Sequence, residues 1–221
     1  SENDNKSSIS AFGYNSKSGK LDFINHQNPN GLNPCYVIND DKNVITANYS
    51  SGNISVLGKN IDGSIGEAKQ LVQHTGKSIN TNRQEAAHAH MVYFSPDKKY
   101  VLANDLGTDK VYVYQYNPNS QTEVLKLKSS VNCTPGSGPR HLIFSNDGKY
   151  VYVLQELDGT ITSFSYADGI LKKVSETKVV AADFKGDIGA ADIHISPDGK
   201  FLYATNRGTA NDISAFKILK D

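Results

Sequence analysis

Histidine, arginine and carboxylate side chains recur at matching places in three successive stretches of this chain. They are His88, His90 and Asp105 in the first stretch, Arg140, His141 and Glu156 in the second, and Asp192, His194 and Arg207 in the third, where the amide of Asn206 precedes Arg207. Imidazole and carboxylate groups transfer protons, and a guanidinium group can hold a carboxylate or phosphate through two parallel hydrogen bonds. Gathered in one place, such residues would bind an anionic small molecule and move protons on it.

Arginine is scarce in this sequence, where 20 of the 23 basic residues are lysine and only Arg83, Arg140 and Arg207 are arginine. Arg140 and Arg207 belong to the set named above, and Arg83 stands shortly before His88. A planar guanidinium is better suited than the ammonium group of lysine to holding an oxyanion at such places. The alternative is that they tie neighbouring repeats together through ion pairs with nearby carboxylates. We favour the anion site for Arg140 and Arg207, whereas for Arg83 both interpretations stay open.

His88 and His90 are two residues apart in an extended segment, so their side chains point the same way. Such a pair can bind zinc if a third ligand such as His141 or His194 joins it. Arginines are the nearest companions, however, and they repel a cation, so we expect no metal here. The sequence contains no phosphate-binding loop, no dinucleotide-binding glycine motif and no nucleophile elbow.

An internal repeat sets the spacing of these residues. A motif of the form Ser-Pro-Asp-Gly-Lys-Tyr-Val-Tyr-Ala begins at Ser95, Ser145 and Ser196, and a weaker copy begins at Asn39. The copies are 56 (39 to 95), 50 (95 to 145) and 51 (145 to 196) residues apart. A second marker, of the form Ile-Ser-Ala-Phe, occurs at residues 9–12, 54–57, 111–114, 161–164 and 213–216.

Each repeat predicts four short strands: an apolar one, an aromatic and β-branched one after an Asp-Gly-type turn, the Ile-Ser-Ala-Phe strand, and a polar outer one. Four strands per unit of this length are typical of a propeller blade, whereas a β-sandwich needs no such repetition. We therefore predict an all-β fold, a β-propeller of four-stranded blades, as a single domain over residues 1–221. It carries about four blades plus part of another, and we expect the chain to be a fragment of a longer one.

The hairpin formed by the first two strands brings the residue before the first strand and the residue after the second to the same rim. The histidines, arginines and carboxylates stand at these two places in three neighbouring blades. The repeated scaffold requires none of these residue types there, so we expect them to form a functional site.

The bulk composition excludes several classes of protein. Acidic and basic residues balance at 23 each, so no nucleic-acid partner is expected. No run of eighteen apolar residues occurs, so no membrane partner is expected either. Cys35 and Cys133 lie far apart without metal-type spacing, which predicts two buried thiols rather than a disulfide.

The ordered set of rim residues resembles the lactonase family of seven-bladed β-propellers. The similar segments are Asn82-Arg-Gln-Glu85, His88-Ala-His90, Asp105 to Asp109, Gly138-Pro-Arg-His141, Glu156, Asp192-Ile-His194 and Asn206-Arg-Gly208. That family includes the propeller-type 6-phosphogluconolactonases and the fungal carboxy-cis,cis-muconate lactonizing enzymes. This chain departs from the family pattern at Ala87, where proline is common.

The resemblance implies seven blades, no cofactor and a central cleft where His, Arg and Glu act on a lactone. By that resemblance the catalytic residues are His90 (or His88), Arg140, Glu156 and Arg207. The remaining rim residues are expected to bind substrate, namely Arg83, His88, Asp105, His141, His194 and Asn206.

The expected reaction is hydrolysis of a sugar δ-lactone, specifically 6-phosphogluconolactone to 6-phosphogluconate in the pentose phosphate pathway. Arg140 and Arg207 would hold the anion and stabilise the oxyanion, and His90 or Glu156 would be the general base. The alternatives are a muconate cycloisomerase, in which the same residues move a proton, and a non-catalytic propeller that binds partners on its faces. The small-molecule lactone is the expected partner, and the family suggests a cytoplasmic location.

Overall fold

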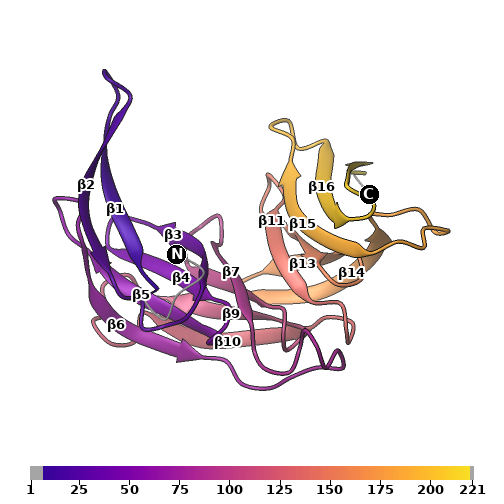
Figure 1. The fold of residues 1–221 in the computed structure, drawn as a ribbon, viewed down its shortest axis with the longest axis horizontal. Helices are drawn as coiled ribbons and strands as arrows, with labels where there is room; N and C mark the ends of the chain where they lie inside the picture. Colours follow the sequence, from indigo (N-terminus) through magenta and orange to yellow (C-terminus); the bar gives the residue numbers. More distant parts are fainter. Residues whose placement is uncertain (1–6, 220–221) are drawn as a thin grey trace.

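The computed structural model of the chain describes residues 7–219, so the ends of the predicted 1–221 domain lie outside the described residues. Within residues 7–219 the chain forms strands β1 to β17, arranged as five antiparallel sheets (Figure 1). No helix occurs in this range, and so none is long and apolar enough to span a membrane.

The sheets follow one another along the sequence, each as a meander. The first consists of β1 (Ile9–Asn15) and β2 (Lys20–Gln27). The second consists of β3 (Pro34–Asn39), β4 (Asn43–Asn48), β5 (Asn53–Lys59) and β6 (Ile65–Gln73). The third consists of β7 (Ala89–Phe94), β8 (Tyr100–Asp105), β9 (Lys110–Tyr116) and β10 (Leu125–Asn132).

The fourth sheet consists of β11 (Pro139–Phe144), β12 (Tyr150–Gln155), β13 (Thr160–Ala167) and β14 (Ile170–Lys178). The fifth consists of β15 (Ile188–Ile195), β16 (Phe201–Gly208) and β17 (Asp212–Lys217). Three complete four-stranded blades, a three-stranded one and a two-stranded one are thus present. The prediction of an all-β propeller array with about four blades plus part of another is confirmed.

The repeated Ser-x-Asp motif closes the turn between the first two strands of a blade. In the third sheet the Ser95 hydroxyl donates to Asp97 at 2.7 Å and accepts a hydrogen bond from the backbone N–H of Tyr100 at 3.0 Å. The fourth residue of the motif has a left-handed backbone conformation, with φ 54° at Lys98 and 71° at Gly148. Glycine adopts that conformation at little cost, which explains why it occurs at this position in the copies that begin at Ser145 and Ser196.

The hydrophobic core lies between neighbouring sheets rather than within one. Ile45 and Val56 of the second sheet, for example, pack in one cluster with Val92 and Ala103 of the third. Two further clusters join the third sheet to the fourth and the fourth to the fifth in the same way. Because the sheets are fastened face to face, the rim residues of adjacent blades are held in fixed relation.

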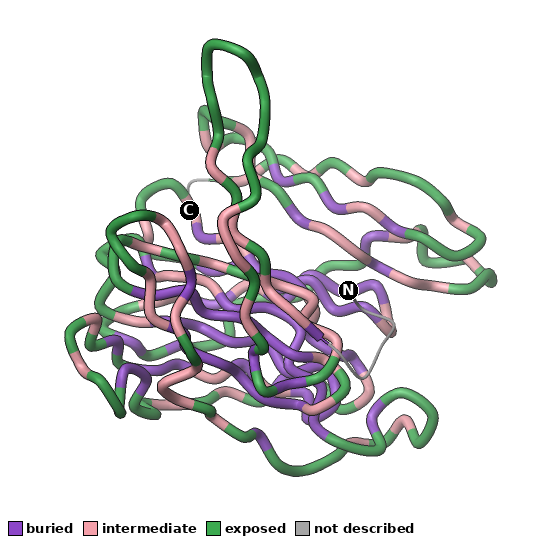
Figure 2. The backbone as a smooth tube through the Cα atoms, turned by 60° about the vertical axis from the view of Figure 1, so that its left-hand side comes forward, coloured by how far each residue is buried: buried purple, intermediate pink, exposed green. Residues whose placement is uncertain are grey.

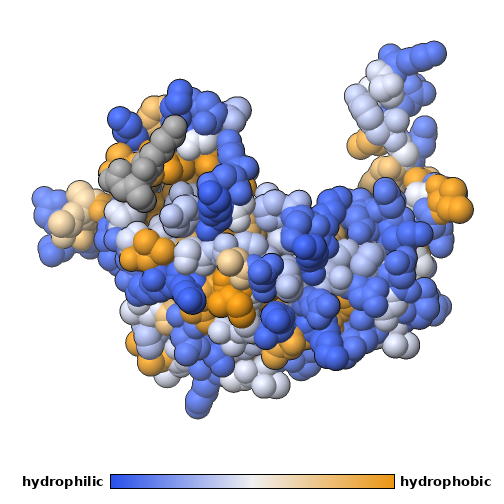
Figure 3. Space-filling model, turned by 180° about the vertical axis from the view of Figure 1, so that it is seen from behind, coloured by the Kyte–Doolittle hydropathy of each residue, from blue (hydrophilic) through white to orange (hydrophobic). Residues whose placement is uncertain are grey.

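The five sheets follow an open arc, with the β1–β2 hairpin projecting at one end (Figure 1). Buried backbone is concentrated in the middle sheets, and the projecting hairpin is mostly exposed (Figure 2). Apolar side chains lie exposed near that hairpin (Figure 3), among them Phe12, Leu21 and Phe23. The last sheet also exposes Ile213, and further exposed apolar side chains, such as Ile61 and Leu127, lie in loops and strands of the middle sheets.

Two predictions about residue placement can be checked at this level. Ala89 pairs with Asp105 and Pro139 pairs with Gln155, so the start of a first strand and the end of a second do share one rim. Cys35 and Cys133 form no disulfide. Cys133 is buried, as predicted, whereas Cys35 is only half-buried.

Candidate active site

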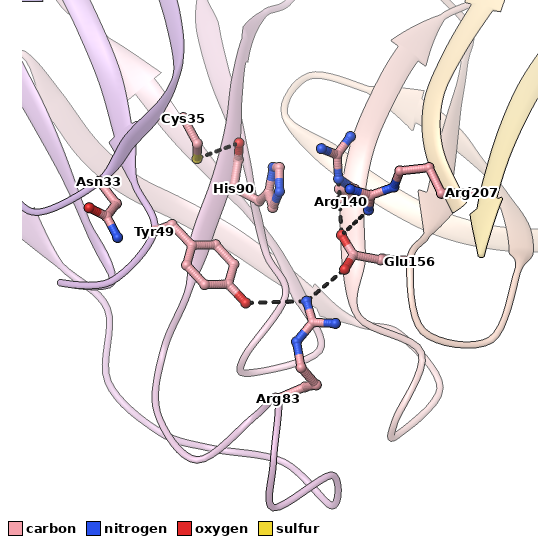
Figure 4. Close-up of a pocket in the computed structure, with 8 residues that line it drawn as sticks. All are labelled: Asn33, Cys35, Tyr49, Arg83, His90, Arg140, Glu156 and Arg207. Atoms are coloured by element: carbon pink, nitrogen blue, oxygen red, sulfur yellow. Dashed lines mark hydrogen bonds and ion pairs between the residues drawn. The ribbon is translucent and has the colours of Figure 1, made fainter. Parts of the chain in front are cut away.

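A cavity of about 480 Å³ opens where the rims of four sheets meet (Figure 4). Its lining residues are Asn33, Cys35, Tyr49, Arg83, His90, Arg140, Glu156 and Arg207. Five of these were predicted from the sequence as site residues, namely Arg83, His90, Arg140, Glu156 and Arg207. The chain therefore does bring the predicted arginines, one histidine and the glutamate together.

A β-bulge at the same place in each first strand presents three of the lining side chains. The register of the first two strands shifts between Pro34 and Tyr36, between Ala89 and Met91, and between Pro139 and His141. The extra residues at these shifts are Cys35, His90 and Arg140. A bulge leaves one residue out of the ladder and re-aims its side chain, which explains why one residue from each blade lines the cavity.

Glu156 follows the end of β12 and binds all three arginines. Its Oε1 lies 2.6 Å from Arg83 Nη2, and its Oε2 lies 3.0 Å from Arg140 Nε and 3.2 Å from Arg207 Nη2. The contact with Arg140 is ionic without the geometry of a hydrogen bond. The second interpretation offered for the arginines, ion pairs that tie blades together, therefore describes the contacts that they make in this structure.

The three arginines differ in how firmly they are held. The Arg140 side chain is 17% exposed and donates from Nη1 to the carbonyl of Ala191. The Arg207 side chain is 55% exposed and donates from Nε to the carbonyl of Gly189 at 3.1 Å. The Arg83 side chain is 43% exposed and reaches only Glu156 and, at 3.4 Å, the Tyr49 hydroxyl.

Arg83 is charged despite its partial burial. Burial opposes the charge, but the contacts with Tyr49 and Glu156 outweigh that effect and raise the pKa of Arg83 above its ordinary value. With three guanidinium groups against one carboxylate, the cavity carries an excess of positive charge. An anionic ligand is the natural counterpart of such a cavity.

His90 lies against this charge cluster as a neutral imidazole. Burial, then the charge of Arg140 and the neighbouring His141, hold the pKa of His90 well below its ordinary value of 6.5. Its ring meets those of Tyr49 and His141 edge-on, at centroid separations of 5.6 and 5.4 Å. Its buried Nδ1 makes no hydrogen bond within the described part of the chain. A neutral imidazole in this position can accept a proton, but only as a weak base, because the same surroundings disfavour its charged form.

His141 contacts Arg140, which lines the cavity, and Asp192, which does not. Its Nδ1 lies 2.8 Å from Asp192 Oδ1, and its Nε2 lies 3.3 Å from Arg140 Nη1. Burial lowers the pKa of His141, although the hydrogen bond with Asp192 opposes that shift. His194 binds the other oxygen of Asp192 at 3.0 Å, but its side chain is 72% exposed and does not line the cavity.

Asp105 is fully buried and also does not line the cavity. It accepts hydrogen bonds from the backbone N–H groups of His88 and Thr108 at 2.9 and 3.0 Å, and it lies 2.7 Å from His74 Nδ1. His74 Nε2 lies 2.7 Å from the Tyr114 hydroxyl. Sequence reasoning offered no role for His74, and the structure places it in this buried network.

His88 lies between that network and the cavity wall. Its ring stacks on Tyr49 with centroids 4.5 Å apart, and its Nδ1 lies 3.0 Å from the Tyr49 carbonyl oxygen. The buried Asn206 accepts a hydrogen bond from the backbone N–H of Gly189 at 3.0 Å. Neither residue lines the cavity.

Across residues 7–219, no three His, Cys, Asp or Glu side chains are arranged to hold a metal ion.

Sequence reasoning missed Asn33, Cys35 and Tyr49, although a signal was present. The weak copy of the repeat begins at Asn39. In the three full copies the rim residues stand four to seven residues before the motif and ten or eleven residues after its start, and the same offsets give 32–35 and 49–50 here. The three missed residues fall at these positions. The rim was predicted from the three full copies alone, and the weak copy at Asn39 was not included.

Comparison with known proteins gives a consistent result. The family model for the seven-bladed β-propeller lactonases matches residues 1–221. A 6-phosphogluconolactonase of Bacillus subtilis is 36% identical over 219 residues, which is 97% of this chain and 61% of that protein. One from Formosa agariphila is 35% identical over 216 residues, covering 96% of this chain and 61% of the relative.

Among solved structures, the periplasmic gluconolactonase of Pseudomonas aeruginosa superposes with a TM-score of 0.90 at 34% identity. The match covers 96% of this chain and 60% of that one. The chain thus spans about three fifths of the length of the relatives it matches. Sequence match, strand order and repeated blades agree, and the chain belongs to the lactonase family of seven-bladed β-propellers.

Proposed function

We propose that the protein hydrolyses a sugar δ-lactone, and specifically 6-phosphogluconolactone to 6-phosphogluconate, a step of the pentose phosphate pathway. The observation that carries this proposal is the convergence of Arg83, Arg140 and Arg207 on Glu156 beside the neutral His90. Two relatives named 6-phosphogluconolactonase and a neighbour named gluconolactonase support the same reaction class. The substrate is a small-molecule lactone, and the excess positive charge favours a phosphorylated one.

In this mechanism Arg140 stabilises the charge that develops on the lactone carbonyl oxygen. It suits that role because it is the least exposed of the three arginines and is fixed by the Ala191 carbonyl. Donors that are already in place require no reorganisation during the reaction. His141 and Asp192 act through Arg140 and His90 as positioning residues, because His141 contacts both.

Hydrolysis requires a base. Water loses a proton to His90 or Glu156 as its oxygen attacks C1 of the lactone. The C1–O5 bond then breaks and O5 takes up the proton that the base accepted from water. The carboxylic acid formed at C1 loses its proton to solvent, and the product is the open-chain carboxylate. Both candidates line the cavity: His90 is neutral, and Glu156 is an acceptor already engaged by arginine. Their geometry with substrate decides between them.

The other predicted residues take supporting positions. We assign Asp105 and His88 to positioning, because Asp105 holds the backbone of His88 and His88 stacks on Tyr49. Asn206 holds the backbone of Gly189, whose carbonyl binds Arg207. His194 is left outside the proposed site, since its exposed side chain contacts only Asp192.

We further propose that these residues are part of one propeller domain that continues in a longer chain, in keeping with the length of the relatives. We propose the cytoplasm as its compartment, because phosphorylated sugars are cytoplasmic metabolites. The name of the Pseudomonas neighbour makes the periplasm the alternative.

The test is an assay of the full-length gene product that contains these residues. We expect hydrolysis of 6-phosphogluconolactone well above the spontaneous rate, and a loss of about 10²-fold or more in kcat with Arg140→Ala, the order found for removal of an oxyanion donor. Circular dichroism of the variant controls for folding. A folded wild-type protein with no more than the spontaneous rate would refute the proposal and leave muconate-type substrates or partner binding.

A further inference from the structure

Both oxygens of Glu156 are in contact with arginine side chains (Figure 4). Arg83 alone binds Oε1, whereas Arg140 and Arg207 share Oε2. Water can therefore deliver a proton to Oε1 most readily once Arg83 has moved away. The state of the Arg83 contact sets whether Glu156 is available as a base.

Arg83 is the arginine best able to move. It lies between β6 and β7, outside any strand, whereas Arg140 is in β11 and Arg207 is in β16. Arg140 and Arg207 are each fixed by a backbone carbonyl, but the remaining contact of Arg83 is the 3.4 Å one with the Tyr49 hydroxyl. Its Nε and Nη1 make no hydrogen bond within residues 7–219 and can bind a ligand in the open cavity.

We propose that a phosphate group on the substrate draws Arg83 off Glu156 and thereby frees Oε1 to accept the proton of the attacking water. This inference rests on the proposed lactonase activity and deepens it, because it makes Arg83 the residue that couples recognition of a phosphorylated lactone to activation of the base. A lactone without phosphate would enter the cavity but leave Arg83 on Glu156.

The charges favour this exchange. A phosphate monoester offers three oxygens and up to two negative charges, whereas Glu156 offers Arg83 one oxygen and shares its single charge among three arginines. Arg207 binds the other oxygen of the same carboxylate, so its guanidinium is near enough to take part in holding the phosphate. After the exchange Glu156 keeps Arg140 and Arg207 as partners and stays oriented.

The experiment compares wild-type, Arg83→Ala and Arg83→Lys forms of the full-length gene product on 6-phosphogluconolactone and on glucono-δ-lactone. For Arg83→Ala we expect kcat/KM on the phosphorylated lactone to fall about 10- to 100-fold, the size of one lost charge-assisted hydrogen bond. Activity on glucono-δ-lactone should rise above the wild-type level, because Oε1 is then permanently free of Arg83. Arg83→Lys should retain part of the phosphate preference.

A second measurement separates the two halves of the substrate. Inorganic phosphite added to glucono-δ-lactone should raise the rate of the wild-type protein and leave that of Arg83→Ala unchanged. Lys149→Ala is the matched control, since it removes a positive charge from an exposed turn and should respond to phosphite as the wild type does.

The outcomes distinguish this inference from the proposed function. If neither lactone is hydrolysed above the spontaneous rate, the proposed function itself is wrong. If both are hydrolysed but Arg83→Ala lowers the two activities equally, or phosphite accelerates the variant as much as the wild type, the lactonase activity stands and the coupling through Arg83 is refuted.

Discussion

Replacing Glu156 with glutamine is the most direct test of the arginine cluster. The substitution keeps the shape of the side chain but removes the one negative charge that faces three guanidinium groups at 2.6, 3.0 and 3.2 Å. The Glu156 side chain is only 7% exposed, so removal of its negative charge leaves three positive charges close together with limited access to water.

The structure sets the size of the effect. The pairs with Arg83 and Arg207 involve arginines that are about half exposed, and such pairs contribute at most about 1 kcal/mol each. The pair with Arg140 is largely buried, and leaving one partner of such a pair alone costs about 3 to 5 kcal/mol. The glutamine oxygen still accepts one hydrogen bond, so we expect a net loss of about 3 kcal/mol in the free energy of unfolding.

Urea denaturation of the full-length gene product followed by circular dichroism measures this loss, with lactone hydrolysis as a second readout. Glu123→Gln is the matched control, because Glu123 is 62% exposed and its Lys126 contact is 3.9 Å long; we expect it to lie within about 0.5 kcal/mol of the wild type. If Glu156→Gln were as stable as Glu123→Gln and fully active, Glu156 would be neither the centre of the cluster nor the base.

Three further changes test other parts of the site. The pKa of His90 is lowered in the folded protein, so below about pH 6.5 the unfolded chain binds a proton at His90 that the folded chain does not, and the free energy of unfolding falls as the pH falls. Urea titrations from about pH 5 to 8 should show a shallower fall for His90→Asn than for the wild type, and an identical slope would contradict the lowered pKa. Asp105→Ala leaves His74 and two backbone N–H groups without their acceptor, so the free energy of unfolding measured with urea should fall by about 3 to 5 kcal/mol. A fall of less than about 1 kcal/mol would mean that this network does not stabilise the fold. Iodoacetamide at neutral pH should label Cys35, which lines the cavity, before Cys133, because burial raises the pKa of the Cys133 thiol to about 12; equal labelling in tryptic mass spectra would contradict this.

The repeated motifs were sufficient to predict the fold, because each blade needs the same turn chemistry and the same apolar strands wherever it occurs. The rim could be predicted for the same reason, since a hairpin fixes which residues share an end. Burial could not be predicted in this way. Asp105 has the residue type and position of a substrate-binding residue, yet its carboxylate is hydrogen-bonded to His74 and to backbone N–H groups. Strand periodicity does not reveal such a partner.

The bulges were the second feature that the sequence did not reveal. Strict alternation along a strand predicts that side chains two residues apart point the same way, but an inserted residue breaks that rule without any characteristic sequence. Cys35, His90 and Arg140 share one position in three blades and have nothing in common chemically. Their common placement becomes evident only when strand pairing is known.

This arrangement explains how a repetitive scaffold can hold a site that does not repeat. The ladder, the turn and the contacts between sheets constrain nearly every other residue of a first strand, whereas the bulged residue stands outside the ladder and its side chain lines the cavity. Each blade can therefore contribute a different side chain there, a thiol, an imidazole and a guanidinium in this chain. Substitutions at His90 should accordingly change activity far more than stability, whereas substitutions at its buried neighbours Ala89 and Met91 should do the reverse. Paired measurements of kcat/KM and of urea denaturation on such variants test this separation directly.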